Sequence, residues 1–415
     1  MEIITQSTCE DLRKAAHGLG FPLFGVTSAS ESPGFARFCR WLDQGYAGNM
    51  DYLSKRRDAY RHPSSVMENV ETLVMLGMPY QPAKSRRKKR SQNDEAILNS
   101  VSDAIPFEPS KDRVDSHSMM AALGMGTGRV AAYATGIQDY HDLIHLRLKQ
   151  LASTLTESFP NARFRGVVDT APLLEREFAS LAGLGWIGKN TLLLNQNAGS
   201  YFFLAAMLTD LKLDHHSQAV VDHCGSCTAC LDACPTQAFP QPHVLDATRC
   251  ISYLTIEHRG AIPIEFRESI GSWVFGCDVC QQVCPWNRMA KPTQERSLRP
   301  QLEFEAFDLL ELLSLDEVAF RQKYRKTPLW RTRRNGMLRN AIIVLGNQKI
   351  KEAIPHLFKM LINDDSILRS TAAWAIGRIG GDESLSKLRE RLSHETNIEV
   401  HKEIVDAIEM ITQSK

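Results

Sequence analysis

The chain has 415 residues, which is enough for two to three domains of ordinary size. Its apolar content of 43% suits globular cores, and its net charge of +1 provides no overall field for nucleic acid, so any such binding must come from local patches. No apolar run approaches the roughly 18 residues of a membrane-spanning helix, and the first residues lack the basic and apolar segments of a secretory signal.

The first 80 residues alternate between helical and strand-like patterns. Residues 12–19 and 35–42 have helical spacing, whereas residues 21–27 and 70–78 have the pattern of buried strands. A polar stretch follows at residues 81–118 and carries five consecutive basic residues, Arg86 to Arg90. Its composition predicts a flexible insertion.

Helical and strand patterns resume between residues 130 and 209, with helices predicted at 140–151 and 173–181 and a strand ending near Val168. This alternation predicts an α/β domain over residues 1–210. Asp169 follows the strand directly, at a junction where ligands of α/β sheets tend to bind. Its carboxyl is therefore either a proton donor or acceptor facing a pocket, or a helix cap.

A glycine-bearing turn follows this helix. Gly183, Gly185 and Gly188 let the backbone approach a large flat or anionic ligand, or they form a simple loop.

Eight of the ten cysteines form two matching runs within residues 211–300, and each run ends in Cys-Pro. This is the spacing of two 4Fe-4S clusters in which the fourth cysteine of each run ligates the other cluster. The expected ligands are Cys224, Cys227, Cys230 and Cys284 for the first cluster, and Cys234, Cys250, Cys277 and Cys280 for the second. Structural zinc in two four-cysteine sites is the alternative. Such ligands need reduced thiols, so we expect a cytoplasmic protein.

After residue 300 the pattern is entirely helical. Two similar segments end in Gly346 and Gly377, 31 residues apart (377 − 346 = 31), and a weaker third copy covers residues 401–408. This period predicts HEAT-like repeats over residues 301–415, with a plain helical bundle as the alternative. Basic residues beside Trp330 and after the Cys250 segment are candidates for RNA phosphates, or else a solvated helix face: Arg259, Arg331, Arg333 and Arg334.

Several motifs together resemble the epoxyqueuosine reductase family. They are Val-Asp-Thr-Ala-Pro at 168–172, Gly-Leu-Gly-Trp-Ile-Gly-Lys-Asn at 183–190, both cysteine runs, Arg-Cys-Ile-Ser-Tyr-Leu-Thr at 249–255 and the repeat at 371–380. This family is similar to the reductive dehalogenases in its cobalamin domain and paired clusters. The resemblance implies an enzyme that uses cobalamin and two 4Fe-4S clusters to convert epoxyqueuosine to queuosine, the last step of queuosine biosynthesis. Its substrate would be the wobble position of tRNAs with GUN anticodons, those for Asp, Asn, His and Tyr.

The resemblance also implies roles for single residues. Asp169 would be the proton donor, with a pKa raised by burial beside the corrin. Cobalamin contacts would come from Arg61, Asp169, Leu193, Ser200, Ser252, Asp278 and Val279. Arg61 has an ordinary alternative as a surface cation paired with Glu68 or Asp58. A histidine lower ligand is not indicated, and His141 is expected to begin a helix.

The expected architecture is a mixed α+β/α multi-domain chain. An α/β cobalamin-binding domain (1–210) precedes a two-cluster ferredoxin-like domain (211–300) and a HEAT-like α-solenoid (301–415). We expect a monomer without membrane association that receives electrons from an unidentified reductase or a flavodoxin- or ferredoxin-type donor. Two other functions remain open: a cobalamin and cluster reductase of a small molecule, such as a dehalogenase, and a non-catalytic electron-transfer or tRNA-binding adaptor.

Overall fold

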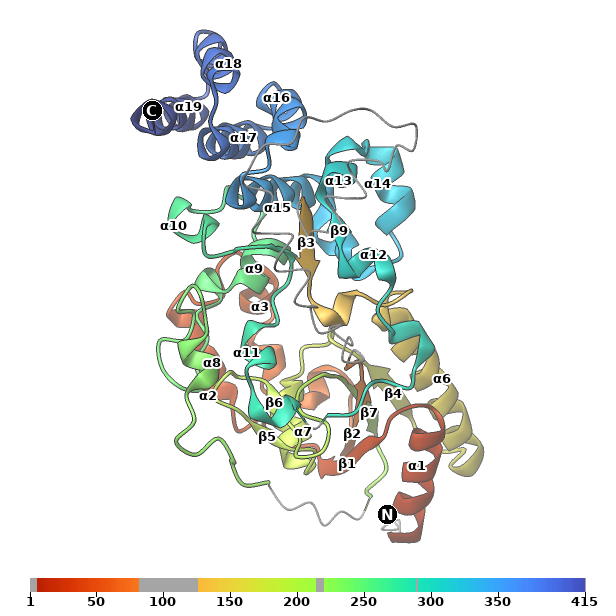
Figure 1. Ribbon diagram of the computed structural model, residues 1–415. Helices are drawn as coiled ribbons and strands as arrows, with labels where there is room; N and C mark the ends of the chain where they lie inside the picture. The colour runs from red at the N-terminus through yellow and green to blue at the C-terminus, as the bar shows by residue number, and fades with distance from the viewer. Residues whose placement is uncertain (1–5, 82–125, 214–219, 289, 415) are drawn as a thin grey trace, which may run out of the picture.

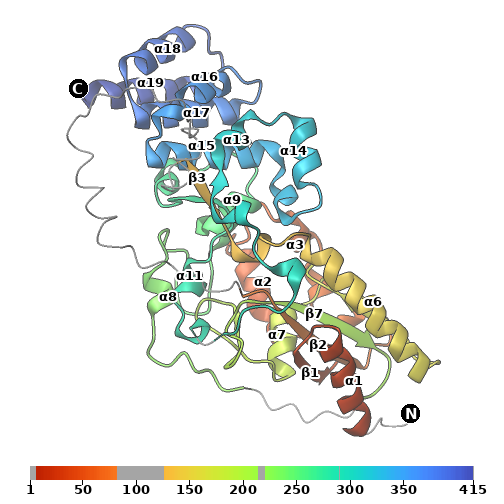
Figure 2. The same ribbon diagram turned by 45° about the vertical axis from the view of Figure 1, so that its right-hand side comes forward.

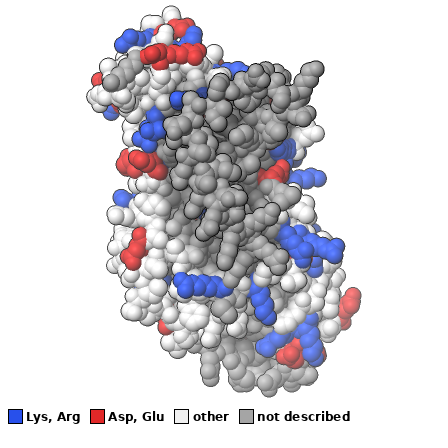
Figure 3. Space-filling view, in the orientation of Figure 1, with Lys and Arg blue, Asp and Glu red and all other residues white. Residues whose placement is uncertain are grey.

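The computed structural model describes residues 6–81, 126–213, 220–288 and 290–414. Its elongated shape has a sheet with flanking helices at one end and the C-terminal helices at the other (Figures 1 and 2). The predicted insertion at 81–118 lies outside the described residues except for Gln81. Basic and acidic side chains are interspersed on the face in Figure 3, in keeping with the small net charge. Among the described residues, no helix combines the length and apolar character that crossing a bilayer requires.

The N-terminal sheet has the strand order β1-β2-β7-β4. These strands are β1 (Leu23–Ser28), β2 (Thr72–Pro79), β7 (Phe202–Thr209) and β4 (Phe164–Val167). One face packs on α1 (Gln6–Gly18) and α6 (Tyr140–Ser158), and the other packs on α7 (Glu175–Leu181). The two central strands, β2 and β7, are almost wholly apolar because both of their faces are covered.

Every pairing in this sheet is antiparallel, so the predicted α/β type, with its parallel strands, is wrong for this part of the chain. The alternation of helices and strands was read correctly, but alternation does not fix strand direction. The long β1–β2 connection contains α2 (Phe35–Asp43) and α3 (Asp51–Lys55) and returns the chain antiparallel to β1.

A second, three-stranded sheet joins distant parts of the chain in the order β8-β3-β9. β3 (Thr127–Val130) precedes the cysteine runs, β8 (Trp273–Phe275) lies between cysteines of the second run, and β9 (Phe307–Asp308) opens the helical region. The cysteine segment otherwise consists of short helices: α8 (Ala229–Asp232), α9 (Ile251–Ile256), α10 (Ile264–Arg267) and α11 (Val279–Gln282). A small hairpin pairs β5 (Trp186–Ile187) with β6 (Leu193–Leu194).

The C-terminal region is helical, as predicted. Its helices are α12 (Leu302–Glu305), α13 (Leu309–Ser314), α14 (Glu317–Tyr324), α15 (Arg333–Gln348), α16 (Ile354–Leu361), α17 (Ser366–Ile379), α18 (Asp382–Leu392) and α19 (Ile398–Gln413). A Cβ at Gly346 would lie 2.8 Å from Trp374, and one at Gly377 would lie 2.8 Å from Ala407. The two glycines of the predicted repeat therefore serve one purpose, the close approach of α15 to α17 and of α17 to α19.

Arg339 and Asn340 of α15 fasten the repeats to the cysteine segment. The Arg339 side chain is 1% exposed, and it donates hydrogen bonds to the carbonyl oxygens of Leu254, His258 and Gly260 at 2.7–2.8 Å. These carbonyls lie at the C-terminal end of α9, where a cation is favoured by the helix dipole. Because α9 begins directly after Cys250, the first repeat helix supports the segment that carries this cysteine.

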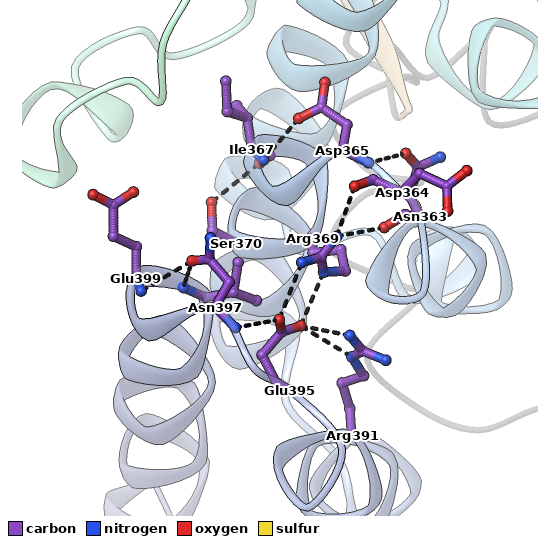
Figure 4. A network of polar contacts seen from close by, with 11 residues as sticks. Asn363, Asp364, Asp365, Ile367, Arg369, Ser370, Arg391, Glu395, Asn397 and Glu399 are labelled. Atoms are coloured by element: carbon purple, nitrogen blue, oxygen red, sulfur yellow. Dashed lines mark hydrogen bonds and ion pairs between the residues drawn. The ribbon is translucent and has the colours of Figure 1, made fainter.

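A buried carboxylate joins three helices of the repeat region (Figure 4). Glu395 accepts hydrogen bonds from Arg369 at 2.9 and 3.0 Å and from Arg391 at 2.6 Å. Burial raises its pKa, but the two guanidinium groups and the Asn397 N–H outweigh burial and lower the pKa to about 2. The pairing therefore stabilises the fold above the ordinary pKa of 4.5 and is lost as the pH falls toward 2.

We expect Glu395→Gln to destabilise the repeat region by about 3 kcal/mol, because both arginines lose their carboxylate partner. Chemical denaturation at neutral pH measures the loss, which should shrink as the pH falls below about 4. Glu390→Gln, which breaks the exposed pair with Lys387, is the control and should change stability little. Equal stability of Glu395→Gln and the unsubstituted protein would contradict this account.

Candidate active site and cluster cavity

Asp169 lies on a short loop between β4 and α7 with its backbone in the left-handed region, at φ +56°. Few residues other than glycine adopt this conformation, and it costs of order 1 kcal/mol unless neighbours hold it. The Asp169 N–H donates to Glu175 Oε1 at 2.8 Å, and its Oδ2 accepts from the Tyr140 hydroxyl at 2.8 Å. The alternative role as a helix cap is wrong, because α7 has Leu174 at its N-cap position and no side-chain cap.

His141 is the second partner of the Asp169 carboxylate, with Nε2 3.3 Å from Oδ2. Its Nδ1 lies 2.7 Å from Asp139 Oδ1, and Asp139 also caps α6 by accepting the His141 N–H. The prediction that His141 begins a helix is confirmed, but sequence reasoning missed its contact with Asp169. The imidazole also stacks on the Tyr140 ring at 4.0 Å, so both donors to Asp169 come from the first turn of α6.

Two donors govern the electrostatics of this group. The pKa of Asp169 is lowered by the hydrogen bond from His141, an effect that burial opposes and Tyr140 reinforces. These donors favour the charged carboxylate more than burial disfavours it, and the rise predicted for burial beside a corrin stays a prediction. The side chain is in fact 57% exposed. Burial raises the pKa of Glu175 to about 8, with help from the Asp169 charge.

The His141 imidazole carries the opposite charge. Burial alone would lower its pKa, but the hydrogen bonds and charges of Asp139 and Asp169 win and raise it to about 9. At neutral pH the loop therefore holds an ionised Asp169, a protonated His141 and a neutral Glu175. Since the folded pKa of His141 is raised, its pairing stabilises the fold below pH 6.5 and is lost as the pH rises through about 9.

Removal of one carboxylate tests this coupling. Asp169→Asn is expected to lower the pKa of His141 from about 9 toward its ordinary value of 6.5, because one of two charged partners is gone. An NMR titration of the imidazole measures the change. Asp210→Asn, in a surface pair with Arg163, is the control and should leave the His141 titration where it is. An unchanged pKa in Asp169→Asn would show that the contact is not formed.

Aromatic and charged side chains from several segments surround Asp169. Tyr52 and Glu257 both contact Arg331: the guanidinium donates to the Glu257 carboxylate and lies 5.9 Å from the Tyr52 ring. Arg331 contributes to the lowered pKa of Asp169. Burial raises the pKa of Tyr133 well above its ordinary value, and the charges of Asp169 and Asp278 add to the effect. Asp169 therefore lies within electrostatic range of Arg331 at the start of the repeats, and it shares an influence on Tyr133 with Asp278 of the cysteine segment.

Four of the cysteines line one cavity of about 230 Å³. They are Cys224, Cys227, Cys230 and Cys284, the set predicted for the first cluster. The other four thiols interact with one another. Burial raises the pKa of Cys277 to about 12, the Val279 N–H opposes this, and the charges of Cys250 and Cys234 reinforce it. Burial likewise raises the pKa of Cys280, as do the charges of Cys250 and Cys277.

The predicted cobalamin contacts lie in two kinds of place. Ser252, Asp278 and Val279 lie next to the second cysteine set, and Asp278 is 4% exposed with Oδ2 accepting the Ala132 N–H at 2.7 Å. Burial raises the pKa of Asp278 to about 6. Leu193 belongs to the core beneath the sheet, and the Ser200 hydroxyl accepts from Gln281 and Asn287 at 3.0 Å each.

Arg61 is exposed and pairs with Glu31 at 3.2 Å, above the Phe35 ring at 4.3 Å. Arg61 is a surface cation, as the alternative predicted, but Glu68 and Asp58 were the wrong partners. Its partner Glu31 lies three residues after the end of β1.

The basic residues divide into two groups. Arg259 donates to the Thr332 and Arg331 carbonyls at 3.1 and 2.8 Å, and Arg334 donates to the Leu315 carbonyl at 2.8 Å. These two guanidinium groups hold the chain around η7 (Pro328–Thr332). Arg331 and Arg333 are exposed, and Arg333 lies 4.5 Å from the Trp330 ring.

Comparisons with known proteins agree with these arrangements. Three family models match: a 4Fe-4S double cluster binding domain at residues 223–287, HEAT repeats at 334–409, and epoxyqueuosine reductase QueG at 101–170. The first match decides between the metal alternatives in favour of 4Fe-4S clusters over zinc. The second confirms the predicted repeats, and the third begins within the predicted insertion.

Individual relatives cover most of the chain. Epoxyqueuosine reductase of Pseudomonas aeruginosa is 38% identical, with 87% of this chain and 92% of that protein covered. The Escherichia coli protein of the same name is 34% identical, with 87% and 86% covered.

Solved structures are equally similar. A crystal structure of epoxyqueuosine reductase with an epoxyqueuosine-modified tRNA-Tyr stem loop matches with a TM-score of 0.82 and 30% identity, covering 98% of this chain and 99% of that one. The Bacillus subtilis enzyme, solved with its catalytic aspartate loop swung out of the active site, matches with a TM-score of 0.81 and 29% identity over 98% and 99% of the two chains. The chain described here belongs to the epoxyqueuosine reductase family.

Proposed function

We propose that this chain reduces epoxyqueuosine to queuosine at the wobble position of tRNA, as a cytoplasmic enzyme of the last step in queuosine biosynthesis. The observation that carries the proposal is the Asp169 loop. A carboxylate with two donors on one oxygen lies close enough to Arg331 and Tyr52 to interact with their charges, and both it and Asp278 of the cysteine segment act on Tyr133. This arrangement brings a proton source, a polar rim and an electron source to one place.

The cysteines fit two 4Fe-4S clusters. The first set lines one cavity with no other sulfur ligand needed. In the second set the charges of Cys250 and Cys234 help burial to raise the pKa of Cys277, and those of Cys250 and Cys277 help to raise that of Cys280. We propose that Cys224, Cys227, Cys230 and Cys284 hold the first cluster, and that Cys234, Cys250, Cys277 and Cys280 hold the second. Each cluster passes one electron at a time. Cysteines bind iron as thiolates, and thiolates held close together without metal disfavour one another's ionisation.

Cobalamin completes the proposed cofactors. When bound it supplies a reduced cobalt that acts as a nucleophile or an inner-sphere electron path. Ser252, Asp278 and Val279 are the proposed contacts beside the second cluster, because Asp278 and Val279 lie between two of its ligands. The Leu193 side chain is packed in the core and the Ser200 hydroxyl is hydrogen-bonded to Gln281 and Asn287, so these two residues would contact cobalamin through backbone atoms. Arg61 would contribute from the exposed rim of the α2 region.

The residues of the Asp169 loop account for the protons. Reduction of the epoxide takes two electrons and two protons, forms a carbon–carbon double bond and releases the oxygen as water. The Asp169–His141 pair holds one proton at neutral pH, since the pKa of His141 is raised to about 9. We propose that Asp169 donates a proton to the leaving oxygen and takes its proton from the His141 imidazolium, so the two residues act together as the acid.

The tRNA would be held by Arg331 and Arg333, with Trp330 as a stacking platform, while Arg259 and Arg334 position that chain segment. We expect Arg333→Ala to weaken binding of an anticodon stem loop severalfold and to lower the slope of log affinity against log salt by about 1. Filter binding across a salt series measures both. Arg13→Ala, on α1 at the opposite end of the molecule, should change neither. An unaltered slope in Arg333→Ala would exclude this phosphate contact.

The remaining partners follow from the same proposal. Substrates would be the tRNAs with GUN anticodons, and electrons would come from a reductase or a flavodoxin- or ferredoxin-type protein. Large apolar side chains exposed among the described residues are single positions in different parts of the chain: Val318 lies on α14, Ile398 on α19, and Ile137 and Val221 lie outside helices and strands. Single exposed apolar residues are ordinary on a monomer's surface, and we propose a monomer.

The test compares substrates. Protein purified anaerobically and loaded with iron, sulfide and cobalamin is given tRNA-bound epoxyqueuosine, the free nucleoside and halogenated aromatics. The proposal predicts turnover of the tRNA in clear excess over the nucleoside and none of the halogenated compounds. Preference for a halogenated compound would favour the small-molecule reductase instead.

A further inference from the structure

The motif Gly-Leu-Gly-Trp-Ile-Gly-Lys-Asn at residues 183–190 has no role in the chemistry proposed above. Its glycines were expected to admit a large flat or anionic ligand, or to form a simple loop. Instead a Cβ at Gly188 would lie 2.6 Å from the Leu194 side chain, so this glycine serves close packing of the β5–β6 hairpin. The hairpin places Lys189, Asn190 and Leu194 on the wall of the cavity of the first cysteine set.

Two buried donors of this motif lack a partner. Trp186 Nε1 and Asn190 Nδ2 form no hydrogen bond within the described parts of the chain, although the two residues are only 2% and 3% exposed. The Asn190 amide is oriented, because its Oδ1 accepts the Leu192 N–H at 3.3 Å and leaves Nδ2 free. Unpaired buried N–H groups are costly and rare, so two on one hairpin call for an acceptor.

The first cysteine set lies where that acceptor would be. Trp186 packs in one apolar group with Cys284, Cys224 and Trp286, with the two indole rings 5.0 Å apart. The indole N–H of this buried ring makes no hydrogen bond among the described residues, although the ring packs against two of the proposed ligands. The Lys189 ammonium donates to the Gly225 and Cys227 carbonyls at 2.6 and 3.0 Å, which fixes the cysteine loop against the hairpin.

We propose that Trp186 and Asn190 donate N–H···S hydrogen bonds to the first cluster and raise its reduction potential. The proposal rests on the ligand set proposed above for that cluster. A cluster gains negative charge on reduction, and hydrogen bonds to its sulfur atoms stabilise this charge. The motif thereby shifts the potential of one cluster and leaves the other unaffected, since Asn190 lines the cavity of the first cysteine set and Trp186 packs against Cys284 and Cys224 of that set.

The test is an EPR-monitored redox titration of the cluster-loaded protein without cobalamin or tRNA. Trp186→Phe keeps the aromatic packing and removes the N–H, so the midpoint potential of the first cluster should shift to a more negative value while that of the second stays constant. Trp374→Phe, which removes an indole N–H from α17 in the repeats, should leave both potentials close to those of the unsubstituted protein. An unchanged first potential in Trp186→Phe, or an equal shift in both clusters, would overturn the proposal.

A second variant guards against loss of the cluster itself. Asn190→Ser removes the amide donor without disturbing the indole, and it should produce a shift of the same sign. Iron and sulfide content of each variant shows that both clusters are present. If the protein reduces epoxyqueuosine in tRNA normally but neither variant shifts the potential of the first cluster, this inference alone is wrong. If the variants shift that potential but the protein does not act on epoxyqueuosine in tRNA, the proposed function alone is wrong.

Discussion

Asp169→Ala is expected to lower the turnover number by about 10²- to 10⁴-fold, the range associated with loss of a positioned proton donor. Iron content and tRNA affinity should stay unchanged, and cobalamin should still bind through its other predicted contacts, because the carboxylate's hydrogen bonds among the described residues go to Tyr140 and His141 of α6. The loss should fall on turnover rather than on KM, since the proton is needed only when the oxygen leaves. Single-turnover kinetics with loaded enzyme measure the effect.

Backbone strain is the competing cause of such a loss. Asp169 has φ +56°, which alanine adopts less readily than asparagine. Asp169→Asn therefore keeps the loop conformation and removes only the acid, and it should be about as inactive as Asp169→Ala. Asp210→Asn is the matched carboxylate control and should retain activity. Near-normal turnover in Asp169→Asn would remove Asp169 from the chemistry.

Cys284→Ser should abolish turnover and remove the first cluster, although Cys284 follows Cys277 and Cys280 in sequence. The reason is the crossed ligation: the cavity that contains Cys284 is lined by Cys224, Cys227 and Cys230. Iron content should fall by about half, because one of two four-iron clusters is lost. EPR spectra of the reduced protein identify which cluster remains.

The comparison variants are Cys224→Ser and Cys277→Ser, which remove one ligand from each set. Crossed ligation predicts that the spectrum of Cys284→Ser matches that of Cys224→Ser. If it matched that of Cys277→Ser instead, each run would hold its own cluster and the proposed sets would be wrong.

The double-cluster domain, the grouping of the first four cysteines around one cavity and the repeats could be predicted from the sequence because each depends on local spacing. Cysteine spacing limits which thiols can converge, and the Cys-Pro ends turn the chain away. Gly346 and Gly377 recur because helices of successive repeats approach each other at the same place. Asp169 was found from its position after a strand, although its left-handed backbone was not foreseen.

Other features depend on contacts between distant segments. The His141–Asp169 contact spans 28 residues and lowers the pKa of Asp169, which no local pattern encodes. Antiparallel pairing of β1 with β2 depends on how a long connection returns, not on either strand's sequence. The glycines of residues 183–190 left a ligand site and a simple loop open, because permissive backbone does not show which side chains, here Leu194 and those of the cysteine cavity, lie beside it. The ion pair of Arg61 with Glu31 likewise joins residues that are distant in the sequence.

We propose that this chain removes the epoxide oxygen from a tRNA wobble nucleoside with Asp169 as the acid. Mass spectrometry of nucleosides digested from epoxyqueuosine-modified tRNA, after anaerobic incubation with loaded enzyme, measures this conversion. We expect epoxyqueuosine to be replaced by a nucleoside lighter by one oxygen atom, and Asp169→Asn to leave it almost unconverted. Intact epoxyqueuosine with fully loaded, unsubstituted enzyme and reductant present would contradict it.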